Sequence, residues 1–318
     1  MTIFISIASY CDKLLPVTVE QAMDNAYRPD DLRFGIVEQS VPIYAETMSE
    51  AVRKQMRLIT VDPFYSRGVC WARALAMTLY SDEDWFMQID AHTIFDKGWD
   101  MQLISLWAEC AKQSPKAYIG SYPHAFEIKD GEYVKQRYTE NIIASAVAKD
   151  VAFPEDMISL LFTPTYVDET KPIRGFHTAA GCVFAPGSFV YEVPYDPYMY
   201  FYGEEALWAL RAYTHGWDLF HVPKLPVYHY YDTGEEMEVK RIRHWHDEHD
   251  TVRTQRWWEL QGRASQRMIG IVDGKNYGVY GLGNVRTVEE YAEFSGLDFK
   301  NRRIEPKAYV GPWSKSNA

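Results

Sequence analysis

The segment from Asp84 to Phe95, with the sequence DWFMQIDAHTIF, decides the fold. Its first half is a short apolar run bounded by charge, which predicts a buried strand of a parallel sheet that ends near Asp90. Ligands of open α/β sheets bind beyond the carboxyl ends of the strands. Asp90 and His92 are two residues apart, so on an extended chain their side chains point the same way. The segment therefore predicts a ligand site at this edge of the sheet.

Asp90 and His92 are the candidate metal ligands of this segment. A carboxylate oxygen and an imidazole nitrogen suit Mn²⁺ or a similar divalent cation such as Mg²⁺, and they leave coordination sites for phosphate oxygens and water. An Asp-x-His sequence also occurs by chance, and Asp90 alone could cap a turn. The segment is thus either a binding site for a metal-diphosphate or the end of a strand without a ligand.

Length and composition predict one catalytic domain. A chain of 318 residues can bury a substantial core. Its 23 Tyr and 10 Trp suit clefts that bind sugars or stack bases, although an aromatic-rich core would use the same residues. The net charge of -11 disfavours broad nucleic-acid binding but leaves room for a local basic track.

Several features predict a soluble, cytoplasmic protein. No apolar run approaches the roughly 20 residues of a membrane span, and Met1 leads directly into a strand rather than a signal sequence. The cysteines are scattered without a C-x-x-C pair, which predicts reduced thiols and disfavours a zinc ribbon or a disulfide framework. They are Cys11, Cys70, Cys110 and Cys182.

The remaining sequence alternates predicted strands with predicted helices. Expected strands cover residues 3–10, 32–39, 56–61, 116–122 and 225–231, and expected helices cover 13–26, 97–113 and 206–214, with a glycine-hinged turn and helix within 65–77. Such alternation predicts a mostly parallel, twisted sheet with right-handed crossovers, flanked by helices. We also expect a hairpin over 126–138 and irregular structure over 141–172.

Two regions besides the Asp-x-His segment have the character of ligand sites. Arg67 and Arg73 flank a helix start whose free amides can hold phosphate, although they could equally be surface charges. Ala180 and Gly181 lie among small residues, which allow the backbone to approach a ligand closely, although a β-bulge would use them too. Both regions are therefore candidates for substrate contact.

These blocks resemble the polypeptide N-acetylglucosaminyltransferases that modify hydroxyproline, a family with the GT-A fold. QIDAHTIF at residues 88–95 is similar to the family's QIDSH block, its form of the Asp-x-Asp metal motif of nucleotide-sugar transferases. RGVCWAR at 67–73 resembles the family's RGxxxAR stretch, and FYGEE at 201–205 its acidic motif. GLGNVRT at 281–287 resembles the C-terminal GLGxxRT block. The resemblance runs in order from Ser6 to about residue 299.

The resemblance implies the chemistry of the site. Glu204 and Glu205 would face donor sugar and acceptor hydroxyl as catalytic carboxylates, unless they only cap their helix. His229 lies in a segment similar to the family's Val-x-His-x-Tyr and would be the third metal ligand, with His221 as the alternative. The residues implied in donor binding are Ser6, Ala8, Ser9, Tyr10, Asp12, Arg67, Arg73, Gln88, Ala91, Ala180 and Gly181.

The resemblance also implies an organisation and a reaction. A GT-A catalytic domain would cover residues 1–235, with a nucleotide-sugar half at about 1–115 and an acceptor half at about 116–235, and a helical extension at 236–318 would pack on it. The enzyme would be a metal-dependent, retaining hexosyltransferase that moves GlcNAc or another hexose from a UDP-sugar to a hydroxyl acceptor, with a protein hydroxyl favoured. Ala91 stands where the family has Ser, which leaves the donor sugar open.

Two other functions remain open. Residues 239–267 carry seven positive and four negative charges, interleaved with Trp257 and Trp258, and such a stretch could track the phosphates of DNA that bears hydroxymethylated bases. The spacing of His244, His246 and His249 could hold a second metal, but a solvated helix is the expected structure there. A non-catalytic carbohydrate-binding protein with the same fold is the other alternative.

Overall fold

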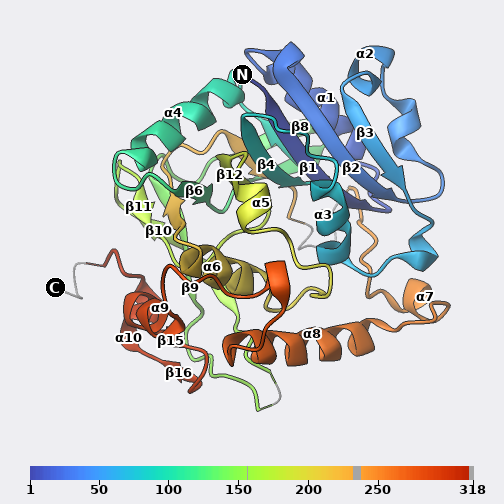
Figure 1. Cartoon of the computed structure of the whole chain (residues 1–318). Coiled ribbons are helices and arrows are strands. Elements are labelled where there is room, and N and C mark those ends of the chain that lie inside the picture. The colour runs from blue at the N-terminus through green and yellow to red at the C-terminus, as the bar shows by residue number, and fades with distance from the viewer. Residues whose placement is uncertain (156, 232–237, 315–318) are drawn as a thin grey trace.

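The computed structural model describes residues 1–155, 157–231 and 238–314 (Figure 1). At its centre lies an eight-stranded sheet with the order β11-β13-β6-β12-β4-β1-β2-β3. Its strands are β1 (Ile3–Tyr10), β2 (Leu32–Gln39), β3 (Met56–Thr60), β4 (Trp85–Asp90), β6 (Ala117–Gly120), β11 (Ile173–Arg174), β12 (Cys182–Pro186) and β13 (Asp218–His221). β3, β2, β1 and β4 run parallel, whereas β12 is antiparallel to both of its neighbours.

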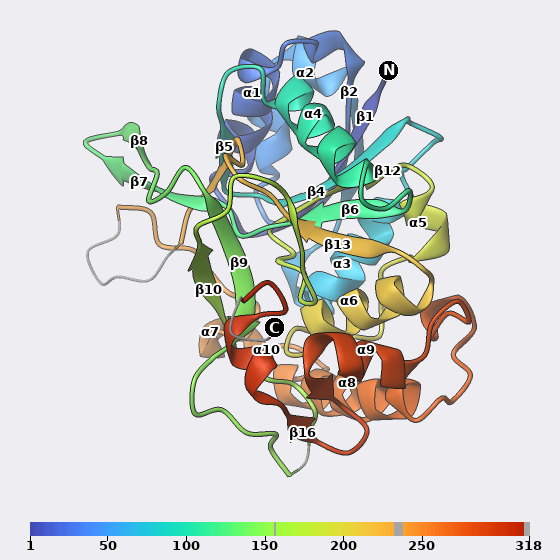
Figure 2. The same ribbon diagram turned by 90° about the vertical axis from the view of Figure 1, so that its left-hand side faces the viewer.

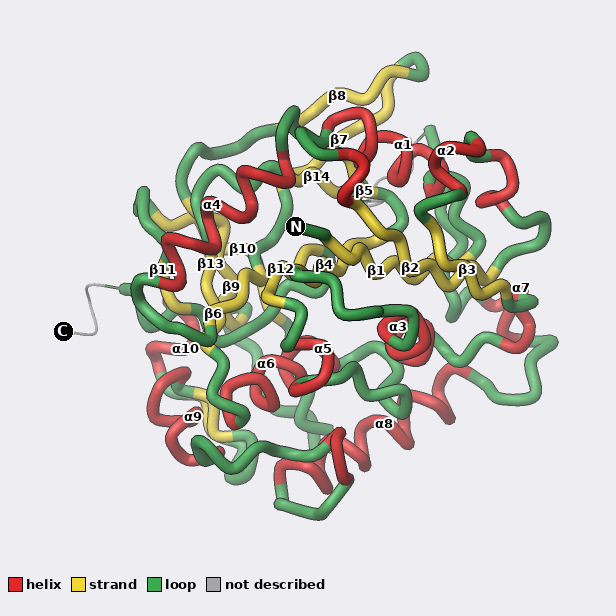
Figure 3. Tube along the Cα trace, turned by 45° about the horizontal axis from the view of Figure 1, so that its top comes forward, coloured by secondary structure: helices red, strands yellow, loops and turns green. Residues whose placement is uncertain are grey.

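Helices cover both faces of this sheet, as Figure 3 shows. One face carries α1 (Leu15–Asn25) and α4 (Trp99–Ala111), and the other carries α3 (Val69–Met77), α5 (Phe189–Glu192) and α6 (Glu204–Thr214). Because side chains alternate along a strand, Ile5 of β1 packs on the first face and Phe4 on the second. The predicted α/β class is confirmed, and α2 (Glu50–Arg53) adds a short helix beside α1 on the first face.

A smaller sheet lies beside the end of β4. Its order is β5-β14-β7-β8, formed by β5 (Thr93–Phe95), β14 (Val227–His229), β7 (His124–Lys129) and β8 (Glu132–Gln136). β7 and β8 form the predicted hairpin. Because β5 follows β4 after a two-residue bend, this sheet brings β14 to the end of the central sheet.

The prediction of irregular structure over 141–172 is wrong in part. β9 (Ile142–Val147) and β10 (Phe162–Val167) form an antiparallel pair. All six residues of β9 are buried, so its run IIASAV has no alternation of polar and apolar residues to mark a strand. The long connection between the two strands hid their pairing from local sequence signals.

The C-terminal part contains α7 (Asp247–Asp250), α8 (Trp257–Val272), α9 (Val288–Ser295) and α10 (Pro306–Val310), together with the β15 (Leu297–Asp298) and β16 (Arg303–Ile304) pair. Figure 2 shows α8, α9 and α10 gathered below α6. Met268 of α8 and Tyr291 of α9 belong to the same buried cluster as Leu207 of α6. The predicted domain boundary at 235/236 lies outside the described residues, and the division itself stays a prediction.

The GLGNVRT block closes the end of α6. The backbone amide of Gly283 donates to Thr214 Oγ1 at 2.9 Å, and the amide of Arg286 donates to the Thr214 carbonyl at 3.2 Å. The Arg286 guanidinium also donates to Asp218 Oδ1 at 2.8 Å. Thr287 then begins α9 with the capping box that the sequence predicts, closed by Glu290.

Two further predictions concern thiols and membranes. All four cysteines are free, as their spacing predicts. Among the helices of the described ranges, none has both the length and the apolar character that crossing a bilayer requires.

Replacing Gly283 with alanine should destabilise the fold. A Cβ there would lie 2.5 Å from backbone atoms of Thr214, and backbone cannot move aside as a side chain can. We expect Gly283→Ala to lower the free energy of unfolding by about 1–3 kcal/mol, measured by urea denaturation. Gly262→Ala is the matched control, because Gly262 lies in α8 with open space around it and should gain about 0.5–1 kcal/mol. Equal effects of the two changes would contradict this account of the block.

Candidate active site

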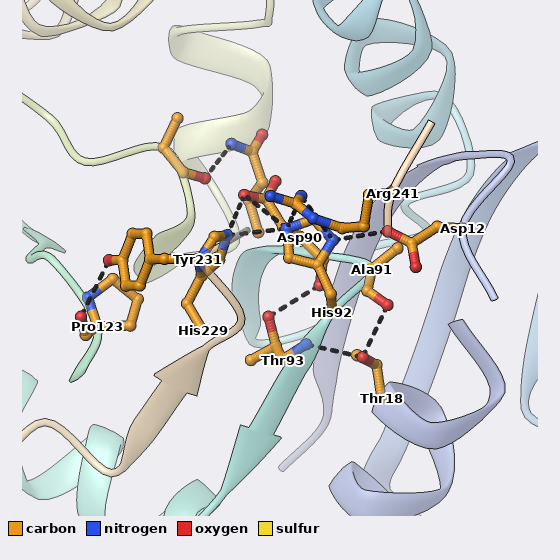
Figure 4. Close-up of polar contacts among 12 residues, drawn as sticks. Asp12, Thr18, Asp90, Ala91, His92, Thr93, Pro123, His229, Tyr231 and Arg241 are labelled. Carbon is orange, nitrogen blue, oxygen red and sulfur yellow. Dashed lines mark hydrogen bonds and ion pairs between the residues drawn. The ribbon is translucent and has the colours of Figure 1, made fainter. Parts of the chain in front are cut away.

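Three predicted metal ligands meet at the end of β4 (Figure 4). Asp90 is the last residue of β4, His92 follows the bend, and His229 is the last residue of β14, which pairs with β5 so that His229 lies opposite Thr93. One ligand atom from each of the three lies within 4.8 Å of the others. His92 Nε2 is 2.9 Å from His229 Nε2, which is 3.1 Å from Asp90 Oδ2.

Two of the three candidate ligands, His92 and Asp90, each have a charged partner that orients the side chain. His92 Nδ1 lies 2.7 Å from Asp12 Oδ2, so the ring can donate its Nδ1 proton to the carboxylate and present Nε2 to the cluster. Arg73 donates to Asp90 Oδ1 at 2.8 Å and leaves Oδ2 directed at His229. A carboxylate behind a ligating imidazole is the usual arrangement in metal sites.

The protonation of the cluster also suits a cation. Although burial opposes ionisation, the positive charge of Arg73 and the hydrogen bond from His229 hold the pKa of Asp90 well below its ordinary value. Burial, followed by the nearby His92, lowers the pKa of His229 to about 4. At neutral pH the cluster therefore offers an ionised carboxylate and a neutral imidazole, the forms that bind metals.

A carboxylate and two imidazoles fit Mn²⁺ or a similar divalent cation. His221, the alternative ligand, is buried in β13 and does not join the cluster that the described residues form. Arg241 also lies at the cluster and donates to His92 Nε2 at 2.6 Å (Figure 4). Arg241 and a bound cation would therefore share one nitrogen lone pair, so the guanidinium must move when a cation binds there.

A cavity of about 170 Å³ opens beside the cluster. Among the residues predicted to bind the donor, those that line it are Ala8, Tyr10, Asp12 and Arg73. Ser6 and Ser9 are fully buried in β1, and neither hydroxyl has a hydrogen-bond partner among the described residues. Arg67 lies apart, because its side chain lines a separate cleft on the other side of the turn at Ser66 and Gly68.

The predicted small-residue loop packs directly against the cluster. A Cβ on Gly181 would lie 3.3 Å from Asp90 Oδ2 and 3.7 Å from His229. Gln88 is buried in β4 and donates to the Ala180 carbonyl at 2.9 Å, which fixes the loop. Ala91 is buried, and its carbonyl accepts from Thr18.

Glu204 and Glu205 face different surroundings although they are adjacent. Glu204 is 6% exposed and accepts hydrogen bonds from Arg73 at 2.8 Å, Tyr195 at 2.6 Å and Cys70 at 2.8 Å. These three donors occupy its carboxylate, so Glu204 positions Arg73. Whether both glutamates contact substrate stays a prediction, and the geometry favours Glu205.

Glu205 is the more accessible of the two carboxylates, with about a third of its side chain exposed. It accepts from the Ala180 backbone amide at 2.7 Å, which ties it to the small-residue loop. Burial and the charge of Glu204 raise the pKa of Glu205 to about 7. His177 Nε2 lies 3.9 Å from Glu205 Oε2. Burial keeps the pKa of the His177 imidazole well below its ordinary value.

The basic stretch folds differently from the expected solvated helix. Within residues 239–267, only 247–250 and 257–267 are helical. His244 is buried between Tyr200 and Ser66, and Arg253 is 5% exposed beside Tyr10. Burial is the physical reason, because the rings of His244 and Trp245 line the cavity, whereas Trp258 stays exposed. The approach of Arg241 to His92 had no local sequence signal either, since the two residues are 149 positions apart.

The comparisons with known proteins concern the family and the fold. The family model described as Glycosyltransferase (GlcNAc) matches residues 42–301. No curated protein sequence matches the chain. The structure of GalNAc-T7 with UDP, GalNAc and Mn²⁺ matches with a TM-score of 0.53 and 14% identity, covering 73% of this chain and 44% of that one. The structure of S. aureus TarS 1-349 in complex with UDP-GlcNAc matches with a TM-score of 0.43 and 12% identity, covering 76% and 62%.

The likeness to GalNAc-T7 establishes the fold. The chain spans less than half the length of the GalNAc-T7 chain that it matches and less than two thirds of the TarS chain. The match to GalNAc-T7 agrees with the predicted GT-A fold.

Removing the Asp90 carboxylate should abolish binding of Mn²⁺. Asp90→Asn keeps the size of the side chain but loses the charged ligand, so we expect no saturable Mn²⁺ binding by electron paramagnetic resonance. Asp12→Asn should weaken binding by about 10–100-fold, because it alters only the partner of His92. His246→Ala, an exposed histidine outside the cluster, should bind as wild type does. Loss of binding in His246→Ala with retention in Asp90→Asn would move the metal site elsewhere.

Glu205 should make the stability of the fold depend on pH. Its pKa rises on folding from the ordinary value of 4.5 to about 7, so its contribution to stability is complete below pH 4.5 and is lost as the pH rises through 7. Glu205→Gln does not titrate, so from pH 5 to pH 8 the free energy of unfolding of this variant should rise relative to wild type. Because a third of the side chain is exposed, we expect a difference of only about 1 kcal/mol.

Thermal or urea unfolding of Glu205→Gln at both pH values measures this difference. Glu46→Gln, a change of an exposed glutamate, is the control and should show no such trend. A relative stability of Glu205→Gln that stays constant with pH would show that the Glu205 carboxyl titrates as it does in the unfolded chain.

Proposed function

The chain belongs to the Glycosyltransferase (GlcNAc) family, and from this membership we propose that it transfers a hexose, GlcNAc or another, from a UDP-sugar to a hydroxyl acceptor with retention of configuration. The single observation that carries the proposal is the convergence of Asp90, His92 and His229 at the mouth of a cavity between β1 and α3. The similar structure of GalNAc-T7 is one with UDP, GalNAc and Mn²⁺, and that of TarS is a complex with UDP-GlcNAc. Retention and the protein acceptor rest on the sequence resemblance.

In this proposal the cluster seats the donor diphosphate. Asp90, His92 and His229 would hold Mn²⁺ or Mg²⁺, which when bound supplies Lewis-acid stabilisation of the leaving diphosphate. Arg73 keeps Asp90 ionised and in place through their hydrogen bond. Arg241, a cation at the same edge, can donate to the diphosphate oxygens once it leaves His92.

Glu205 is the carboxylate that we assign to the reacting sugar. Its tie to the Ala180 amide holds it over the loop that packs on the metal cluster, within reach of a sugar seated there. With a pKa near 7, it can accept a hydrogen bond from a sugar hydroxyl or take the acceptor proton at neutral pH. Glu204 contributes by fixing Arg73.

The acceptor side is an aromatic cleft of about 380 Å³ that begins at the cluster. Tyr231 links the two, because its ring centroid lies 4.3 Å from that of His229. The other rings of the cleft belong to Tyr122, Phe126, Tyr138 and Tyr166. Its only ionisable lining group besides tyrosines, among the described residues, is Glu127, so the cleft suits a neutral acceptor that stacks on rings, such as a hydroxyl-bearing protein segment.

Modified DNA remains the second candidate acceptor, with weaker support. The basic stretch that suggested it offers no continuous track, because Arg253 is buried and Arg241 points at His92. The alternative of a non-catalytic sugar-binding protein is disfavoured by family membership. A cytoplasmic location is part of the proposal and agrees with four free cysteines.

Hydrolysis of UDP-sugars without an acceptor tests the proposed function. With Mn²⁺ we expect slow release of UDP from one sugar of a panel, and with EDTA we expect none. Asp90→Asn should lower the rate by about 100-fold or more, because the leaving diphosphate loses its cation. His246→Ala should stay near the wild-type rate. No release from any sugar, with no thermal shift on adding UDP, would favour the sugar-binding alternative.

A further inference from the structure

A second cleft, larger than the donor cavity, lies on the other side of α3. Its volume is about 610 Å³, within the range of pockets that hold a nucleotide-sized ligand. Three elements enclose it: the outer side of α3, the segment 197–199 and the start of α8. Apart from Arg67, no residue assigned above to the metal, the sugar or the acceptor lines this cleft. The donor contact of Arg67 stays a prediction.

The lining of this cleft is basic and aromatic. Arg67, Arg263 and Arg267 contribute guanidinium groups, and no carboxylate is among the lining side chains of the described residues. The lining of this cleft thus carries positive charge although the chain as a whole has a net charge of -11. The rings belong to Trp71, Tyr198 and Tyr280.

Arg267 is fixed in place before any ligand arrives. It donates to the buried Asp196 at 2.7 Å, and its guanidinium lies 4.7 Å from the ring centroid of Tyr198 and 4.4 Å from that of Tyr277. Asp196 balances its charge, so Arg267 serves mainly to order the aromatic wall. Fixed rings lose little conformational freedom when a ligand stacks on them.

Arg67 and Arg263 carry the charge that a ligand would meet. Both are exposed, and among the described residues neither forms an ion pair with a carboxylate; Arg263 donates only to the backbone carbonyl of Glu259. Two unpaired guanidinium groups attract a doubly charged anion, and planar guanidinium groups bind phosphate in a two-pronged manner. Tyr198 is 63% exposed and offers an open ring beside them.

We propose that this cleft is a second binding site, which takes a phosphate-bearing ligand with a stackable ring, that is, a nucleotide, either free or within a single strand. An acidic peptide would satisfy the arginines but would leave the rings unused, which is why the nucleotide is favoured. The site shares a wall with the donor cavity, since Ser66 and Gly68 line one side and Arg67 the other. This inference does not depend on the proposed transfer reaction.

Fluorescence anisotropy with labelled thymidine monophosphate and with a labelled oligothymidylate of about ten nucleotides tests the site. EDTA is present throughout, so that the metal cluster cannot hold phosphate. We expect binding at low salt that weakens as salt rises, with a slope near -1.4 for two phosphate contacts to a single strand, or about -0.7 for each contact. Binding of both probes would identify a mononucleotide site, and binding of the strand alone would identify a strand site; both support the proposal.

Charge reversal supplies the variant and its control. The double change Arg67→Glu and Arg263→Glu should weaken binding at least tenfold without altering the melting temperature, since both side chains are exposed. Arg53→Glu reverses the charge of one exposed arginine on α2, which lies at the top of Figure 1 whereas α8 lies at the bottom, and should have no effect. Three results would each overturn the proposal: no binding of either probe at low salt, equal binding by the double variant, or equally effective competition by polyglutamate.

Discussion

The buried guanidinium of Arg73 bridges two carboxylates, and the arrangement of the site depends on this contact. Arg73 lies on α3, is 4% exposed, and donates to Asp90 of β4 and Glu204 of α6. A buried charge without partners is strongly destabilising, so these three groups require one another. The bridge therefore holds the end of β4, the middle of α3 and the start of α6 in one fixed relation, and the candidate metal cluster is built on the strand end.

This bridge also separates the roles of two adjacent glutamates. Successive residues of a helix point about 100° apart, so when Glu204 turns toward Arg73, Glu205 must face the loop at Ala180. The charge of Glu204 then contributes to the raised pKa of Glu205. The two glutamates form one acidic motif in the sequence, but they have different surroundings in the structure. Glu204 positions Arg73, and Glu205 has a pKa suited to proton transfer.

Local sequence patterns predicted the parts of the fold whose signals are short in range. The strands at 3–10 and 32–39 appear at the predicted residues, because buried β-branched runs between polar ends leave few alternatives. The pairing of β9 with β10, the inward turn of Arg253 and the place of Arg67 depend on contacts between distant segments, which no local pattern contains. The Asp-x-His pair could be predicted because its two residues are close in the sequence. His229 is distant in the sequence, so its prediction needed the resemblance to a family.

The C-terminal block shows how remote motifs can serve one helix. Residues 281–287 contain no group that reaches the metal cluster, yet Gly283 and Arg286 bind the last turn of α6 at Thr214, and Arg286 also holds Asp218 of β13. The first turn of the same helix carries Glu204 and Glu205. Because an α-helix is stiff along its axis, fixing its last turn limits how far its first turn can tilt away from Arg73 and Ala180. Blocks that lie far apart in the sequence thus act on one element, and a motif that does not reach the cluster still helps to fix the helix that carries Glu205.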